Sequence, residues 1–375
     1  MPVPRVQANI VTVSSDRPDH SNAAAVGGSP KVIDGPGEYD IAGVIITGIA
    51  TQKREPGRAR SPRRRNTAYV IEIDGLTVCH LGDLAEVLVV ARPDDRPTLD
   101  VVERWHERDA RVRRVTVLEP GHIPPVVAGL RAATGEIVAF LDDDTEARPG
   151  WLRALAGPFT DPTVACVGGR VETPGIRAVV HPDAGRWRWY GAFVGNVGLR
   201  DDPGPVEVDT GPEGNWAWRR EVLVALVFDD VLNEGDASMY GLDLTMQAKR
   251  AGFRVVFAPE ARVLHHVAPR DPSLDRSDLP ARTRTFNRNM TYIALRHLPP
   301  FRKAVFFVWW WLVGTRGSYG ILGWLADRAR GRPITPGLLR PTLAGKLEGT
   351  RLWAGRALQR THGPGPRLVE TRERG

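Results

Sequence analysis

An apolar run that ends in three adjacent carboxylates most constrains the fold of this chain. The segment reads VAFLDDDTEARPGWL, from Val138 to Leu152. Its apolar part has the composition of a buried parallel strand, and open α/β sheets bind ligands just beyond the carboxyl ends of such strands. Asp142 and Asp144 are two residues apart, so their carboxylates can share one hard divalent cation whose other ligands are a diphosphate and water. The structural alternative is an acidic turn that caps a helix beginning near Pro149.

Strand and helix patterns alternate around this segment. Strands are predicted within residues 86–95, 111–119 and 135–144, and helices near 98–108 and 124–133. Such alternation is typical of a parallel sheet with crossover helices.

Four motifs occur in a characteristic order and spacing. They are GEIVAFLDDDTEARPGWL, DPTVACVGGRVETPG, GNWAWRREVL and YGLDLTMQAKRAGFRVVFAPEARVLHHVAPR. As an ensemble they resemble the family-2 glycosyltransferases, over roughly residues 86–316. The resemblance implies an α/β fold of the GT-A type, Rossmann-like with a mostly parallel sheet, and a nucleotide-sugar donor. It also implies that Asp142 and Asp144 hold Mn²⁺ or Mg²⁺ on the donor diphosphate, with Asp143 between them in the donor site.

The resemblance places further carboxylates in the donor and acceptor sites. Asp94 and Asp95 match an acidic residue that faces the nucleoside, and a helix N-cap is a compatible alternative for either. Inverting transfer needs a carboxylate that removes the proton of the acceptor hydroxyl. In YGLDLTM, Gly241 takes a position that is often acidic, whereas Asp243 is retained and is the expected base. Its alternative role is that of a first-turn residue stabilised by the helix dipole, and Asp236 is the reserve candidate.

A histidine and two tryptophans complete the expected site. His265 falls where related enzymes have a histidine near the metal, and neutral imidazole is a competent Mn²⁺ ligand. A structural histidine is the alternative. Trp216 and Trp218 are placed beside the acceptor, where an aromatic face can stack on a sugar, and core packing is their alternative.

Residues 10–84 have a different pattern, with short strands separated by turns. The dipeptide Asp74-Gly75 lies between two apolar runs and predicts a tight hairpin. This segment resembles an interior fragment of a metallo-β-lactamase-like hydrolase, a family with an HxHxDH zinc motif. Ser15 and Arg17 replace the first two histidines of that motif. The residues that still match zinc ligands are Asp19, His20, His80 and Asp83.

The two resemblances meet near residues 84–87, and both are incomplete. The family-2 domain normally begins with a strand and helix that precede the strand in 86–95, and here that first unit is missing. Either the strand that ends in CHLGDL takes its place or the sheet has an unfilled position. We therefore expect a β-rich metallo-β-lactamase-like fragment in 1–85, a GT-A domain in 86–300, and an apolar and basic helical tail in 301–375.

The charge distribution and the two cysteines indicate which partners and which cellular compartment to expect. The net charge of +7 is concentrated in the tail and in residues 53–65, which favours contact with anionic surfaces. No nucleic-acid reader motif accompanies this charge, so nucleic acid is not an expected partner. Cys79 and Cys166 lie in apolar runs and are expected to be buried thiols in a reducing compartment. The amino terminus lacks the pattern of a signal peptide, and we expect a cytoplasmic protein.

The segment 304–326 is rich in tryptophan and other apolar residues but is interrupted at 315–318. Its apolar runs fall short of the ~20 residues that span a bilayer. Tryptophans beside basic residues suit a membrane interface, which predicts peripheral contact with the inner face of the membrane. A helix that packs on the catalytic domain is the alternative.

These features favour a metal-dependent inverting glycosyltransferase that moves a sugar from a nucleoside-diphosphate donor to a glycan or lipid-linked hydroxyl acceptor in cell-envelope synthesis. A degenerate fusion that binds nucleotide-sugars or partners without turnover is the first alternative. A zinc-dependent hydrolase is the second, and the loss of two histidines disfavours it.

Overall fold

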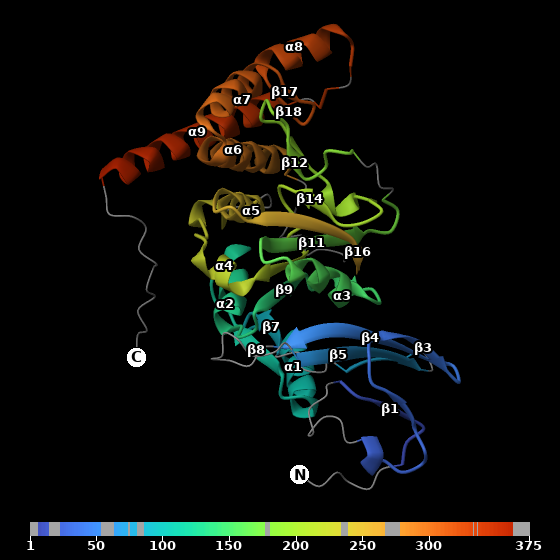
Figure 1. Cartoon of the computed structure of the whole chain (residues 1–375). Coiled ribbons are helices and arrows are strands. Elements are labelled where there is room, and N and C mark those ends of the chain that lie inside the picture. The colour runs from blue at the N-terminus through green and yellow to red at the C-terminus, as the bar shows by residue number, and fades with distance from the viewer. Residues whose placement is uncertain are drawn as a thin grey trace, which may run out of the picture.

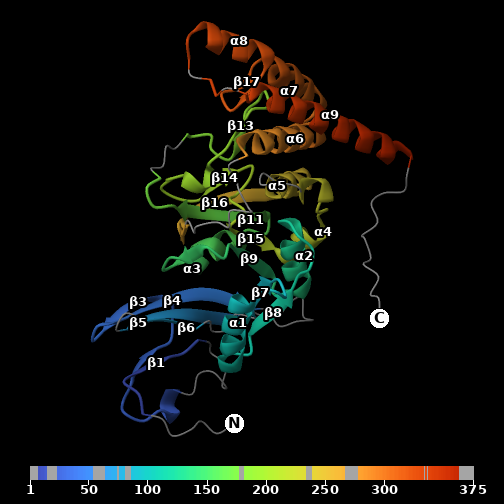
Figure 2. The same ribbon diagram turned by 180° about the vertical axis from the view of Figure 1, so that it is seen from behind.

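The computed structural model describes residues 7–14, 23–53, 64–73, 76–80, 86–176, 181–233, 239–266, 278–332, 334–335 and 337–362. A β-rich amino-terminal part lies at one end of the molecule and a helical carboxyl-terminal part at the other (Figure 1). The α/β domain lies between them, as the reverse view also shows (Figure 2).

The amino-terminal part consists of two small sheets. Strands β1 (Ile10–Thr12) and β2 (Lys31–Ile33) form a parallel pair, and η1 (Ala23–Ala25) lies between them in sequence. An antiparallel meander follows, with β3 (Gly37–Ile41), β4 (Val44–Lys53), β5 (Arg64–Ile73) and β6 (Leu76–His80) in sequence order. Ile73 pairs with Leu76, as expected for a hairpin around residues 74–75. The β-rich prediction is confirmed.

The central sheet has the order β10-β16-β11-β15-β9, with β14 also paired to β16. Its strands are β9 (Ile137–Leu141), β10 (Thr145–Ala147), β11 (Val164–Glu172), β14 (Val206–Val208), β15 (Asn215–Arg219) and β16 (Arg254–His265). Strands β9, β11 and β16 run in one direction and β10, β14 and β15 in the other. The sheet is therefore mixed rather than mostly parallel as expected, because β15 lies between β9 and β11 and is antiparallel to both.

A second parallel pair, β7 (Val87–Ala91) and β8 (Val112–Thr116), is joined through α1 (Arg96–Arg108), and α2 (Ile123–Ala132) follows β8. In the described part of the chain, β7 pairs only with β8 and β9 only with β15. Doubly wound sheets have the order 3-2-1-4, so a first strand would lie between β7 and β9. The sheet is thus interrupted where the expected missing strand belongs. Strand β6 pairs with β5 and does not fill this position.

The remaining elements connect and cover these sheets. In the α/β domain they are α3 (Trp151–Ala156), η2 (Gly157–Thr160), β12 (Arg186–Trp187), β13 (Phe193–Val194), η3 (Val197–Leu199), α4 (Arg220–Ala225), η4 (Asp230–Asn233) and α5 (Tyr240–Arg250). In the carboxyl-terminal part they are α6 (Leu279–His297), α7 (Pro300–Leu312), β17 (Gly314–Thr315), β18 (Ser318–Tyr319), α8 (Ile321–Ala329) and α9 (Leu339–His362). Arg153 of α3 donates a hydrogen bond to the Gly48 carbonyl and so links the domain to β4.

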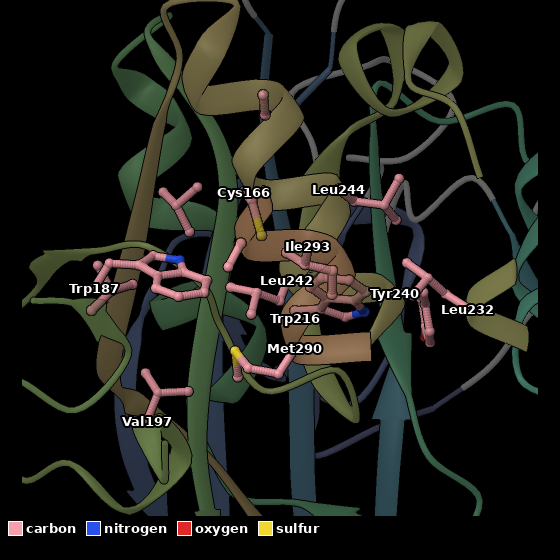
Figure 3. Close-up of a cluster of buried hydrophobic side chains, with 14 of the residues drawn as sticks. Cys166, Trp187, Val197, Trp216, Leu232, Tyr240, Leu242, Leu244, Met290 and Ile293 are labelled. Atoms are coloured by element: carbon pink, nitrogen blue, oxygen red, sulfur yellow. The ribbon is translucent and has the colours of Figure 1, made fainter. Parts of the chain in front are cut away.

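One hydrophobic core joins the central sheet to α5 and α6 (Figure 3). Trp216 and Trp218 of β15 are fully buried, and their rings meet edge to face with centroids 5.3 Å apart. Cys166 of β11 lies in the same core, as expected, whereas the side chain of Cys79 is outside the described residues. Burial of such large aromatic rings contributes ~2–3 kcal/mol each, so β15 is firmly held at the centre of the domain.

Helix α9 packs closely along α6 because it presents glycine at the contact. A side-chain carbon at Gly345 or Gly349 would collide with the backbone carbonyls of Arg284 and Arg288. Between these glycines, buried Lys346 donates hydrogen bonds to the carbonyls of Trp310, Ser318 and Tyr319. Burial lowers the pKa of Lys346 to about 7. The helical prediction for the tail is confirmed, and these contacts attach α9 to the rest of the protein.

Candidate active site

The three carboxylates form a tight turn at the carboxyl end of β9. The Asp142 amide donates to the Gly214 carbonyl at 3.2 Å, which fixes the turn against the start of β15. The Asp142 carbonyl accepts from the Thr145 amide at 3.2 Å and from Thr145 Oγ1 at 2.6 Å. A strand therefore delivers these side chains to the sheet edge, and the alternative of a simple helix cap does not describe it, because Gly150 precedes α3 with no side-chain cap.

Strand pairing brings Asp144 to His265. Thr145 of β10 lies opposite His265, the last residue of β16, so the preceding aspartate is adjacent to the imidazole. His265 Nε2 lies 3.1 Å from Asp144 Oδ2, and its Nδ1 lies 3.4 Å from Thr173 Oγ1. His266 instead pairs with Glu146 at 3.0 Å. Two predicted metal ligands, far apart in sequence, thus lie together.

Asp142 belongs to the same electrostatic environment. Removal of its carboxyl group from water raises its pKa, and the negative charges of Asp144 and Asp143 raise it further. Gly214 is closely opposed to Asp142, since a side-chain carbon there would collide with Oδ2. Crowded carboxylates favour a bound cation, which relieves their mutual repulsion.

The donor set fits a divalent cation that is shared with a substrate. Asp144 and His265 offer one oxygen and one nitrogen ligand, a combination that suits Mn²⁺ better than Mg²⁺. No group of three or more candidate metal-binding side chains occurs among the described residues. A cation here would therefore need ligands from a diphosphate or water, as expected for a donor-binding site.

The two aspartates expected at the nucleoside both have structural roles. Asp95 caps α1 by accepting from the Thr98 amide at 3.3 Å. Asp94 pairs with Arg92 at 3.2 Å. Both side chains are exposed, so the N-cap alternative is observed and nucleoside contact stays a prediction.

Asp243 occupies a buried ion network. Its side chain is 1% exposed, and Oδ1 lies 2.7 Å from His297 Nε2. Oδ2 accepts from Gln247 Nε2 at 2.7 Å and from Arg296 Nη1 at 3.1 Å. An acceptor hydroxyl cannot reach a carboxylate that is enclosed and paired in this way. Asp243 instead has the alternative role that we considered, as an acidic residue in the first turn of α5. The reserve candidate, Asp236, lies outside the described residues.

Glu213 is a site residue that the sequence reasoning did not identify. It precedes Gly214 in the loop before β15, and its Oε1 accepts from the Gly241 amide at 2.8 Å. Burial raises its pKa to about 7, the Gly241 hydrogen bond opposes this shift, and the charge of Asp142 adds to it. The signal for this residue was indirect. A glycine at 241, where an acid is often found, leaves room for a carboxylate from elsewhere.

The tryptophans expected beside the acceptor lie in the core instead. Trp216 and Trp218 are 1% and 0% exposed, so neither presents a face to a sugar. Asn215 is also buried, and its side chain joins Trp151 Nε1, the Arg170 carbonyl and the Ala261 carbonyl. This motif supports the site rather than lining it.

The zinc candidates of the amino-terminal part cannot be placed. Ser15, Arg17, Asp19, His20 and Asp83 lie outside the described residues. The backbone of His80 belongs to β6, but its side chain is also outside them.

Comparison with known families matches both parts of the chain. The part of the chain after the amino-terminal sheets is α/β, as expected. Residues 76–223 match the Glycosyl transferase family 2 model, and residues 1–103 match the Beta-lactamase superfamily domain model. Both resemblances expected from the sequence are therefore confirmed, over the residues that these two models match.

Among the proteins similar to this chain are a curated relative and two solved structures. The chain is 31% identical over 174 residues to the Pre-mycofactocin glycosyltransferase of Mycobacterium tuberculosis strain H37Rv, covering 45% of this chain and 34% of the relative. The chain thus spans about a third of that relative's length. S. aureus TarS 1-349 in complex with UDP-GlcNAc is 16% identical, with TM-score 0.44 and coverage of 73% of this chain and 82% of that one. GalNAc-T7 with UDP, GalNAc and Mn²⁺ is 17% identical, with TM-score 0.43 and coverage of 68% and 53%.

Proposed function

We propose that this chain is an inverting glycosyltransferase that moves a sugar from a nucleoside-diphosphate donor to a hydroxyl acceptor in cell-envelope glycan synthesis. The pairing of Asp144 with His265 at the end of β9 carries the proposal. The family-2 match over 76–223 supports it, because the DDD strand end falls within the matched residues.

Asp144 and His265, with Asp142 beside them, would hold Mn²⁺ or Mg²⁺. When bound, such a cation neutralises charge on the diphosphate leaving group. The protein itself contributes a rigid turn, since the Asp142 backbone is fixed by Gly214 and Thr145. Asp94 and Asp95, exposed at the start of α1, would accept hydrogen bonds from the nucleoside.

Binding of the donor product provides the first test. The melting temperature of the purified chain is measured with UDP or GDP, each with Mn²⁺, with Mg²⁺ and with chelator. A nucleotide at ~100 times its Kd stabilises the folded state by ~2.7 kcal/mol, which corresponds to a shift of several degrees. We expect this shift only when nucleotide and cation are both present. No shift with either nucleotide under any of these conditions would refute the proposal.

Binding without turnover is a second candidate function. The interruption of the sheet between β7 and β9 favours it, because an incomplete sheet can leave the nucleotide pocket imperfectly shaped. Release of UDP or GDP from UDP-glucose, UDP-GlcNAc and GDP-mannose separates the two candidates. A metal-dependent melting shift without any release would support this second function.

We also propose that α7 and α8 contact the inner face of the membrane. Six exposed apolar side chains form what we call the α7/α8 apolar face, and they are Phe307, Val308, Leu312, Ile321, Leu322 and Leu325. Exposed arginines at 316, 328, 330 and 332 are close in sequence and would favour anionic lipid. No helix in the described ranges is long and apolar enough to cross a bilayer.

A further inference from the structure

We propose that Glu213 is the catalytic carboxylate that accepts the proton of the acceptor hydroxyl, in place of the acidic side chain that position 241 lacks. This inference rests on the proposed glycosyl transfer. It assigns the base to the loop before β15 rather than to α5.

The two positions compete for one space. A side-chain carbon at Gly241 would lie 2.5 Å from Glu213 Cγ and 2.7 Å from Glu213 Oε1. Such approaches do not occur between real atoms, so a side chain at 241 and the present conformation of Glu213 exclude each other. The carboxylate of Glu213 therefore occupies the volume into which an acidic side chain at 241 would extend.

Glu213 has the access that Asp243 lacks. Its side chain is partly exposed, and Oε1 is fixed by the Gly241 amide. Among the described residues, Oε2 has no hydrogen-bond partner, so this oxygen is available to an acceptor hydroxyl. By contrast, both oxygens of Asp243 are bound within a network that is closed to solvent.

Glu213 also lies on the side of the metal and donor residues. It is followed by Gly214, whose carbonyl accepts from the Asp142 amide and whose α-carbon is closely opposed to Asp142 Oδ2. A carboxylate next to this turn is positioned near the anomeric carbon of a donor whose diphosphate lies at Asp142 and Asp144.

The proposed step involves only the donor, the acceptor and the Glu213 side chain. Oε2 of ionised Glu213 takes the proton from the acceptor hydroxyl. The acceptor oxygen forms a bond to the anomeric carbon as the bond from that carbon to the diphosphate oxygen breaks. The electron pair of the broken bond leaves with the nucleoside diphosphate, and the attack from the opposite face inverts the anomeric centre.

Capping of α5 is the competing role for Glu213. The N-cap residue Met239 makes no side-chain cap, and Glu213 satisfies one amide of the first turn. A glutamine keeps both the size and the oxygen acceptor of this cap but cannot take up a proton at neutral pH. Glu213→Gln therefore separates the two roles.

The test measures release of UDP or GDP from UDP-glucose, UDP-GlcNAc and GDP-mannose by the full chain with Mn²⁺ and octyl glucoside. Glu213→Gln should keep the nucleotide-dependent melting shift and lose ~10²- to 10⁴-fold in rate. Glu221→Gln, an exposed glutamate on α4, is the matched control and should keep the parent rate. A Glu213→Gln variant that binds nucleotide and transfers at the parent rate overturns the proposal.

A relocation variant gives a second, independent measurement. Gly241→Asp alone should lose activity, because its side chain collides with Glu213. Glu213→Ala combined with Gly241→Asp removes the collision and returns a carboxylate to the same space, so it should be at least tenfold faster than Glu213→Ala. No recovery, with the melting shift intact, counts against the shared position. A parent chain that releases no nucleotide from any donor would instead overturn the glycosyltransferase function, and the role of Glu213 with it.

Discussion

His297 Nε2 lies 2.7 Å from Asp243 Oδ1, and both side chains are at most 2% exposed. The pair joins the first turn of α5 to the last turn of α6. Arg296 extends the network by bridging Asp243 to Asp229, which also accepts from Tyr292 and Arg356. Removing one partner of such a buried ion pair destabilises the fold, because the other charged group stays buried without its partner.

Asp243→Asn should therefore destabilise the fold by roughly 3 kcal/mol, because Arg296 would keep only one of its two buried carboxylate partners and His297 would lose its charged partner. Chemical denaturation of the full chain measures this change. Asp100→Asn, an exposed residue on α1, should change stability by less than ~0.5 kcal/mol. If Asp243→Asn keeps full stability and nucleotide binding but loses transfer by 10²-fold or more, Asp243 is the base after all.

The same pair predicts a pH dependence of stability. Burial holds the pKa of His297 below its usual value, although the hydrogen bond and charge of Asp243 oppose this shift. The unfolded chain therefore binds a proton at this histidine near pH 6.5, where the folded chain does not. Stability from this group is present above about pH 6.5 and is lost as the pH falls from there through the folded-state pKa.

Denaturation between pH 8 and pH 5 tests this dependence. His297→Gln should flatten the acid side of the stability profile, whereas His106→Gln, an exposed change on α1, should leave the profile unchanged. An equal slope in His297→Gln and the parent would show that another group controls acid stability.

Asp144→Ala should make donor binding independent of Mn²⁺. The variant removes the carboxylate that lies against His265 and leaves only Asp142 and His265, which are too few ligands to hold a cation against water. Titration calorimetry with UDP, in Mn²⁺ and in chelator, should give equal and weaker affinities. Glu103→Ala, exposed on α1, is the control and should keep the metal dependence. Unchanged Mn²⁺ dependence in Asp144→Ala would remove Asp144 from the metal site.

The local sequence pattern was sufficient to predict those strands and helices that form within a single segment of the chain. The strand at 137–141, the helices near 98–108 and 124–133 and the β-rich start could all be predicted from periodicity and turn residues. The pairing of Asp144 with His265 could be anticipated only from the family resemblance, because the two residues are 121 positions apart in the chain.

The roles of Asp243 and Glu213 depend on long-range packing, which the local sequence pattern does not show. Asp243 has the residue type of a base, yet the arginine and histidine that enclose it come from α6. Glu213 has the pattern of an ordinary turn residue, and its position against Gly241 depends on how the loop before β15 meets α5. Both outcomes follow from contacts between distant elements, which periodicity does not encode.

The α7/α8 apolar face leads to the last prediction, that the chain binds anionic membranes through these helices. Helix α7 has a second face that packs inward, where Phe306 and Trp310 are 1% and 4% exposed. Deleting residues 304–375 would therefore disturb the core as well as the surface, and point changes are the sharper test. Val308, Leu322 and Leu325 are 50–57% exposed, and none of them belongs to the hydrophobic core of the α/β domain.

Val308→Ser, Leu322→Ser and Leu325→Ser combined should abolish sedimentation with phosphatidylglycerol vesicles, because three apolar side chains no longer enter the interface. The melting temperature should stay near that of the parent. Leu347→Ser, a single exposed leucine on α9, is the control and should bind as the parent does.

The parent should bind phosphatidylcholine vesicles more weakly, since exposed arginines at 328, 330 and 332 attract only anionic lipid. If the triple variant sediments with the vesicles as the parent does, the apolar face does not contact the bilayer; if it melts well below the parent, these side chains belong to the packed core.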